Sequence, residues 1–229
     1  LILDRNGIVL ADNITTVSLV LIPSQIVNKE EVSKTLAEIL NVSYDEIYEH
    51  VSKNVSIERV HPEGRGLSYD IADRISSYHY DGVYLVKESK RYYPYENMLS
   101  HVLGYVGIDN QGLSGLELQY DDILTGEDGA IQYYSDAKGN KLTLSDVYVK
   151  PQDGMDLQLT IDINIQKSVE RELDNVVNMM NPDMALAVVM NPKTGEVLAM
   201  SSRPTFDPNN YKNYSSEVLS RNLPIWASY

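Results

Sequence analysis

The sequence contains no cysteine in its 229 residues, which excludes disulfide bonds, thiol nucleophiles and thiolate metal sites. Histidine is scarce, and its four copies have neither the HxxxH nor the HExxH spacing of a zinc site: His50, His61, His79 and His101. Neither a GxGxxG nor a GxxxxGK[ST] phosphate-binding loop occurs. The sequence therefore predicts neither a metal ion nor a bound cofactor.

Basic residues and long apolar runs are also in short supply. The chain has 19 Lys and Arg against 33 Asp and Glu, which gives a formal net charge of -14. A surface with that balance repels phosphate backbones, so we expect no nucleic acid among its partners. No stretch approaches the roughly 20 apolar residues that a membrane-spanning helix requires.

What the sequence does contain is enough apolar material for a substantial core. Hydrophobic residues make up 43% of the chain, and its length suits one large or two small domains. The pattern of apolar and turn-forming residues changes at the turn 151–154. We therefore place a domain boundary there, with one domain at 1–152 and the next at 153–229. Because the chain opens on Leu1 and closes on an apolar segment, we expect both ends to lie inside a longer protein.

Local patterns in the first domain predict hairpins and helices. Asn6-Gly7 between apolar runs is a strong hairpin signal because both residues tolerate positive φ. The alternating, β-branched stretch 16–22 predicts a further strand. Two helices are expected to begin at capping boxes, Asn28 with Glu31 and Ser43 with Glu46, and a third is expected from Ser68 to about Ser77. Two more helices are expected in a stretch rich in glycine and tyrosine: 98–105 and 116–124.

After residue 154 the pattern indicates a strand, a long helix and a hairpin. Residues 156–161 alternate as a strand, and Asp162 is the expected N-cap of an amphipathic helix that runs to about Met180. Nearly continuous apolar strands at 185–190 and 196–200 are expected to be buried on both faces. Together these elements predict an α+β fold.

Several short strings match the signatures of serine acyl-enzymes. Ser135-Asp136-Ala137-Lys138 matches SxxK, Lys193-Thr194-Gly195 matches KTG, and Ser52-Lys53-Asn54 and Ser220-Arg221-Asn222 match SxN. The chemistry needs the serine at a helix start, with the lysine one turn later on the same face. Ser135 instead lies on a predicted hairpin strand, where residues three apart face opposite sides. No SxN lies between this SxxK and this KTG, so we assign no catalytic residue to the chain.

Two other hydrolytic chemistries have little support. Ser100 and His101 are neighbours on a predicted helix and point in different directions, and GxSxG is absent. Carboxylates are abundant, but nothing marks one pair of them for glycoside chemistry. An unrelated acid-dependent hydrolase would be revealed by two facing carboxyl groups with raised pKa values.

The chemically unusual residues lie in the glycine-rich stretch between 91 and 117. Glycines at that density indicate close backbone approach or positive φ. We expect Arg91 and Glu117 to form a buried bidentate ion pair that locks the turns as a scaffold. The alternative is a surface that signals to a partner protein.

Five motifs follow one another along the chain. They are Asp4-Arg5-Asn6-Gly7 with Leu10-Ala11; Arg91-x-Tyr93-Pro94 with His101-x-x-Gly104; Gly112-x-x-Gly115-Leu116-Glu117; Leu159-Thr160-Ile161-Asp162 with Gln166; and Asn191-Pro192-x-Thr194-Gly195-Glu196-x-Leu198-Ala199-Met200, with Pro204-x-Phe206-Asp207-Pro208-Asn209 behind it. In this order they resemble class B penicillin-binding proteins. The wording of the second motif is close to sporulation-type and elongation-type members from Gram-positive bacteria.

The resemblance implies an elongated pedestal domain, followed by the opening helix and antiparallel strands of a penicillin-binding transpeptidase domain. It implies a peptidoglycan D,D-transpeptidase in which a serine attacks a D-Ala-D-Ala bond and passes the acyl group to an amine, and which β-lactams trap. It further implies an N-terminal membrane anchor, an extracytoplasmic position and a polytopic membrane glycosyltransferase as partner. The residues with an implied structural or partner-contact role are Asp4, Arg5, Gly7, Arg91, Tyr93, Pro94, Gly104, Gly112, Gly115 and Glu117.

The sequence departs from this family at its end. The family's active-site Ser-x-x-Lys follows shortly after the segment that closes here at Tyr229, so we expect the chain to supply the pedestal and partner-contact surface and not the nucleophile. Lys193-Thr194-Gly195 corresponds to an early strand turn of the family and not to its catalytic triplet. The alternative hypothesis is an autonomous, non-catalytic protein-interaction module.

Overall fold

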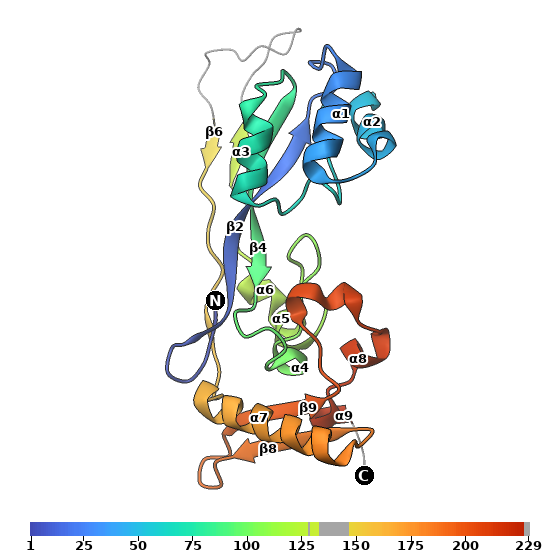
Figure 1. Cartoon of the computed structure of the whole chain (residues 1–229). Coiled ribbons are helices and arrows are strands. Elements are labelled where there is room, and N and C mark those ends of the chain that lie inside the picture. The colour runs from blue at the N-terminus through green and yellow to red at the C-terminus, as the bar shows by residue number, and fades with distance from the viewer. Residues whose placement is uncertain (128, 133–146, 227–229) are drawn as a thin grey trace. The chain divides into compact units, whose positions relative to one another are not determined.

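A computed structural model describes residues 1–127, 129–132 and 147–226 of the chain (Figure 1). It divides into two compact units, which we call the main unit and the inserted unit. The main unit comprises Leu1–Asp12 and Arg91–Tyr229, and the inserted unit comprises Asn13–Lys90. The boundary that the sequence suggests after residue 152 stays a prediction.

The inserted unit consists of three helices beside a small antiparallel sheet. Its strands are β3 (Glu58–Arg59) and the greater parts of β2 (Val9–Leu21) and β4 (Val83–Tyr92), with β2 paired to both of the others. Its helices are α1 (Lys29–Leu40), α2 (Tyr44–Ser52) and α3 (Tyr69–Ser77). The expected caps at Asn28 and Ser43 are confirmed, and Ser68 caps α3 in the same way: each side chain accepts a backbone N–H three residues on.

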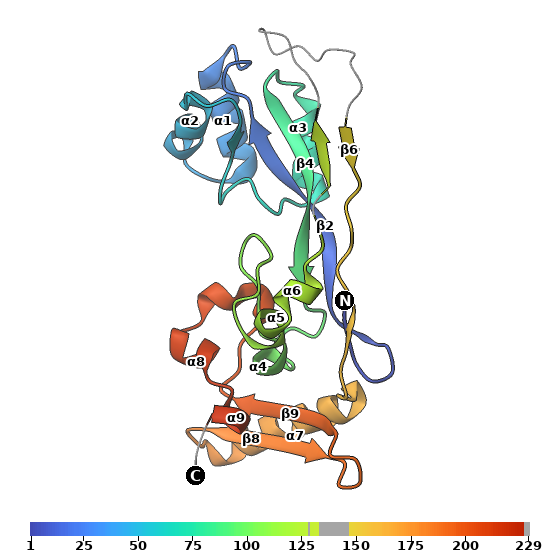
Figure 2. The same cartoon turned by 180° about the vertical axis from the view of Figure 1, so that it is seen from behind.

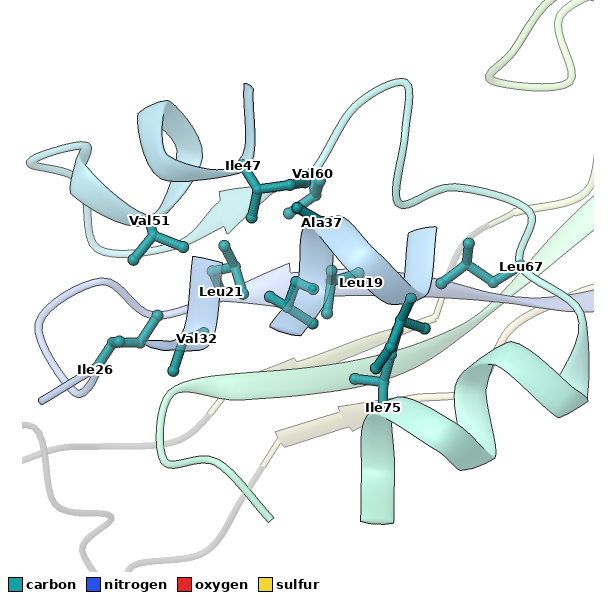
Figure 3. Close-up of a cluster of buried hydrophobic side chains, with 12 residues drawn as sticks. Leu19, Leu21, Ile26, Val32, Ala37, Ile47, Val51, Val60, Leu67 and Ile75 are labelled. Atoms are coloured by element: carbon teal, nitrogen blue, oxygen red, sulfur yellow. The ribbon is translucent and has the colours of Figure 1, made fainter. Parts of the chain in front are cut away.

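The core of the inserted unit lies between these helices and one face of the sheet (Figure 3). Leu19 and Leu21 alternate along β2 and point toward the apolar stripes of α1 and α2, where Leu36 and Ile47 are fully buried. Burying each such side chain stabilises the fold by about 1.5–3 kcal/mol. The unit therefore has a hydrophobic core of its own.

The main unit begins with the hairpin that the sequence predicted. Strand β1 (Ile2–Leu3) pairs antiparallel with the start of β2, with Ile2 opposite Ala11. On its other side β1 pairs in parallel with β7 (Leu157–Gln158). The stretch between 91 and 152 adds α4 (Ser100–Leu103), α5 (Gly115–Gln119), α6 (Asp121–Leu124) and the strand pair β5 (Ala130–Gln132) and β6 (Val147–Val149).

The last part of the main unit is a long helix packed against a hairpin (Figure 2). Helix α7 (Ile163–Met180) begins at the expected cap, Asp162. Strands β8 (Ala185–Met190) and β9 (Val197–Arg203) pair antiparallel, and the segments η1 (Pro208–Asn213), α8 (Ser216–Ser220) and α9 (Leu223–Trp226) follow. The prediction that both strands of this hairpin are buried on two faces is wrong for β8, where Val188 and Met190 are 43% and 54% exposed.

Tertiary contacts change several local expectations. The strand expected at 16–22 is the end of the single long strand β2. The helix expected at 98–105 is confined to α4 because Leu99 and Gly104 on its two sides have φ of 60° and 81°.

None of the helices in the described ranges is long and apolar enough to cross a membrane.

Candidate functional site

The first motif is a turn built around a buried carboxylate. Asp4 is fully buried and accepts backbone N–H groups from Asn6 at 2.7 Å, Ile8 at 2.8 Å and Ile163 at 3.3 Å. Burial acts to raise the pKa of Asp4, but the three backbone donors and the Asn6 amide outweigh it and lower that pKa. Gly7 closes the turn at φ 82°. Since Ile163 is the first residue of α7, Asp4 fastens the hairpin to that helix.

Arg5 makes a second set of links from the same turn. Its backbone N–H donates to the carbonyl of Ile161 at 2.9 Å, and its own carbonyl accepts from the Gln158 side chain at 3.1 Å. Its guanidinium lies 3.7 Å from the Glu196 carboxylate, and both side chains are partly exposed. This exposed pair contributes little, so the backbone contacts do most of the fastening.

The second and third motifs meet in a buried ion pair. Arg91 Nε donates to Glu117 Oε1 at 2.7 Å, and the two side chains are 6% and 4% exposed. The Tyr93 hydroxyl donates to the same Glu117 oxygen at 3.1 Å. Burial, and then the Glu117 carboxylate beside it, raise the pKa of Tyr93. The Arg91 backbone N–H is held by the Asn110 side chain at 3.1 Å.

The glycines of these motifs allow backbone segments to touch. A Cβ on Gly104 would collide with the carbonyl of Ser114, and one on Gly112 would collide with the carbonyl of Glu117. A Cβ on Gly115 would lie 2.6 Å from the backbone nitrogen of Gly104. Gly104 and Gly115 also adopt φ of 81° and 60°. The contact between α4 and α5 therefore depends on the absence of side chains at these positions.

Pro94 lies in an exposed turn whose anchor is its neighbour Tyr93. The Asn209 side chain accepts the Tyr93 N–H at 3.0 Å and donates to the Tyr93 carbonyl at 3.0 Å. Asn209 is 116 residues further along the chain. Sequence reasoning gave it no role, because no local pattern connects residues so far apart.

A second buried charge cluster also escaped sequence reasoning. Glu170 of α7 and Arg203 of β9 form an ion pair of 2.7 Å with both side chains 10% exposed. Glu170 also holds the backbone N–H of Leu99. Neither charged residue belongs to a motif that the sequence singled out, although Gln166 nearby does.

His101 joins α4 to the segment before α9. Its Nε2 donates to the Val218 carbonyl at 2.9 Å, so Nδ1 carries the lone pair and lies 3.3 Å from the Ser202 hydroxyl. Its ring and that of Phe206 pack edge to face, with their centroids 5.0 Å apart. Burial, assisted by the charge of Arg203, lowers the pKa of His101. His101 is therefore a neutral packing residue.

These groups do not assemble a catalytic centre. Ser100 lies 3.4 Å from His101 Nδ1, but it is buried beside a cavity of about 10 Å³, which holds one water molecule at most. A larger cavity of about 480 Å³ is lined mainly by apolar residues, and His101 is its one ionisable side chain within the described chain. Wherever the structure is described, no three His, Asp or Glu side chains are grouped to hold a metal ion.

The serine-enzyme strings are scattered. Lys193–Gly195 forms the turn between β8 and β9, Ser52–Asn54 ends α2, and Ser220–Asn222 ends α8. Ser135 and Lys138 lie outside the described residues. The carboxyl groups with a displaced pKa in the described chain, Asp4, Glu58 and Glu172, are all displaced downward, which gives no support to an acid-dependent hydrolase.

The fold and the buried contacts define a scaffold in which the first motif and the second-motif stretch are fastened to α7 and the β8–β9 hairpin, and the third motif is fastened to the second. The chain belongs to the penicillin-binding protein family. Residues 1–159 match the penicillin-binding protein dimerisation domain, and residues 185–229 match the penicillin-binding protein transpeptidase domain. The α+β fold and the family predicted from the sequence are confirmed.

Three similar proteins place the chain within that family. It is 49% identical over its whole length to stage V sporulation protein D of Bacillus subtilis, of which it covers 35%. It is 31% identical to peptidoglycan D,D-transpeptidase FtsI of Escherichia coli K12, with 98% of this chain and 39% of that protein covered. Penicillin binding protein 2X from Streptococcus thermophilus superimposes with a TM-score of 0.62 at 25% identity, over 91% of this chain and 35% of the other. The chain thus spans little more than a third of these relatives.

Proposed function

We propose that this chain forms the front portion of a peptidoglycan D,D-transpeptidase that cross-links stem peptides through a serine acyl-enzyme. Its part is to hold the transpeptidase domain in place and to present a partner-contact surface, with the pedestal at 1–152 and the transpeptidase segment from 153. The nucleophile belongs to a part of the protein beyond these residues. The order of the two family matches, dimerisation domain first, supports this division of labour.

One observation carries the proposal: the Asp4 carboxylate of the first motif accepts the N–H of Ile163, at the start of α7. A residue at the beginning of the pedestal thereby fixes the opening helix of the segment that leads to β8 and β9. Such a link is useful to a protein that must hold one domain at a set orientation. An autonomous interaction module, the alternative, has no need of it.

The location and partner follow from the proposed substrate. Peptidoglycan lies outside the cell membrane, so we place the protein on the extracytoplasmic face, held by an N-terminal anchor. A polytopic membrane glycosyltransferase that makes the glycan strand is the proposed partner. The 49% identity to a sporulation protein favours a role in spore formation over one in vegetative growth.

Covalent labelling with a fluorescent penicillin tests the proposal. We expect a longer protein that contains this chain and the remaining transpeptidase region to be labelled in a one-to-one ratio, and unlabelled penicillin to compete. Residues 1–229 alone serve as the matched control and should take up no label. A folded longer protein that binds a partner but stays unlabelled would instead support the autonomous module.

A further inference from the structure

We infer that Glu170 is a positioning residue. Through it, the segment that carries the second motif, 91–104, holds strand β9 of the transpeptidase region. This inference rests on the proposed function, because it concerns how the pedestal controls acylation at the catalytic centre that the proposal places beyond these residues. It is carried by the contacts of one buried carboxylate with three separate segments of the main unit: the turn at Leu99, helix α7 and strand β9 (Figure 1).

Both oxygens of the Glu170 carboxylate are fully engaged. Oε1 accepts the Leu99 backbone N–H at 3.3 Å and the Gln166 side-chain amide at 2.7 Å. Oε2 accepts the Ser201 hydroxyl at 2.7 Å and lies 2.7 Å from Arg203 Nη2. A buried carboxylate with this many donors links all of them at one point, because charge-assisted hydrogen bonds are short and strong.

The β9 side of this cluster is itself rigid. Arg203 Nη1 donates to the Ser201 hydroxyl at 2.9 Å and to the Ser202 carbonyl at 3.0 Å, and its Nε donates to Asp174 at 2.6 Å. Gln166 donates to the Met200 carbonyl at 2.9 Å and accepts the Met200 N–H at 2.9 Å. Three successive turns of α7 therefore fix the backbone of β9 from Met200 to Arg203.

The pedestal side of the cluster is a strained turn. Leu99 has φ 60°, a left-handed conformation that is unfavourable for a residue other than glycine. It lies between Pro94 and Gly104 of the second motif, and α4 begins immediately after it. Because the Glu170 carboxylate bonds the Leu99 N–H, a shift of that turn pulls on the same carboxylate that holds Ser201 and Arg203.

Glu170→Gln in the longer protein is the direct test, and Glu172→Gln is the matched control. Glu172 is on the same helix, 62% exposed and paired with Arg171. We expect E170Q to be acylated by fluorescent penicillin about 10-fold more slowly, because small displacements of reacting groups are costly, while the labelled fraction at completion stays that of the wild type. E172Q should match the wild type in both rate and labelled fraction.

A merely structural role predicts a different outcome: a lower labelled fraction with an unchanged rate for the molecules that react. That result, or equal rates for E170Q and E172Q, overturns the inference. Should E170Q fold poorly, Ser201→Ala removes one of the donors without a change of charge, and a wild-type rate in S201A also overturns it.

Amide exchange separates this inference from the proposed function. We expect faster hydrogen exchange at the Leu99 amide in E170Q than in E172Q, whether or not the longer protein is labelled. Faster exchange in E170Q than in E172Q, together with a wild-type protein that takes up no label, would leave Glu170 as a link and contradict the transpeptidase proposal. Equal exchange in the two variants removes the Glu170 link.

Discussion

Charged residues in this chain differ greatly in what their ion pairs contribute to the stability of the fold. Arg91 and Glu117 are buried together, whereas Arg171 and Glu172 form an ion pair with 70% and 62% of their side chains exposed. An exposed pair is screened by water and is worth little. A buried pair is costly to break, because removal of one partner leaves the other charged and desolvated.

Glu117→Gln should therefore lower the free energy of unfolding by about 3–5 kcal/mol, since the buried Arg91 guanidinium loses its counter-charge and keeps only a neutral acceptor. Glu172→Gln should change it by no more than about 0.5 kcal/mol. Urea unfolding of the two variants, followed by circular dichroism, checks the difference. Equal midpoints for E117Q and E172Q would show that the buried pair is no lock.

His101 makes stability depend on pH in a defined direction. Its pKa is lowered in the folded protein by burial, so the unfolded chain takes up the proton first as pH falls. Stability from this group is fully present above its unfolded pKa of about 6.5 and declines as pH drops below it. We expect His101→Gln to lose part of the fall in melting temperature between about pH 7 and 5. An identical fall in wild type and variant would contradict this.

At the scale of elements, the close contact between α4 and α5 requires glycines at particular positions. Gly104 and Gly195 both have positive φ, 81° and 77°, but only Gly104 has backbone atoms where a Cβ would be placed. The two glycines therefore compare a positive-φ position with open space around it and a positive-φ position with a steric clash.

Gly195→Ala should cost about 1 kcal/mol, the penalty of a left-handed non-glycine residue. Gly104→Ala should cost about 2 kcal/mol or more beyond that, because α4 must move away from Ser114. Thermal unfolding of both variants measures the difference. If G104A is no less stable than G195A, the two helices do not depend on close backbone approach.

The elements that the sequence predicted well are those with local causes. The caps at Asn28, Ser43 and Asp162 act within one turn, so their side chains mark the helix starts directly. The helix expected at 98–105 failed because its ends are set by contacts with residues beyond 110. Glu170 was missed for the same reason, since its partners lie 71 and 31 residues away in the sequence.

At the scale of the whole molecule, the sequence motifs act through the contacts that they make with distant segments of the chain. The motif order identified the family from sequence, because five spaced signatures are far more specific than any one of them. The short SxxK, KTG and SxN strings were rightly given no catalytic role, since the chemistry depends on their assembly and the described copies lie in separate parts of the chain. We therefore interpret the described chain as a scaffold that positions catalytic residues which lie outside it.

The position of the penicillin adduct tests that central claim most directly. After labelling, the longer protein is digested and the acylated peptide is identified by mass spectrometry. We predict that the adduct is on a serine beyond residue 229, at the start of a helix and one turn before a lysine. An adduct on Ser135, or on any other serine among residues 1–229, would contradict the account.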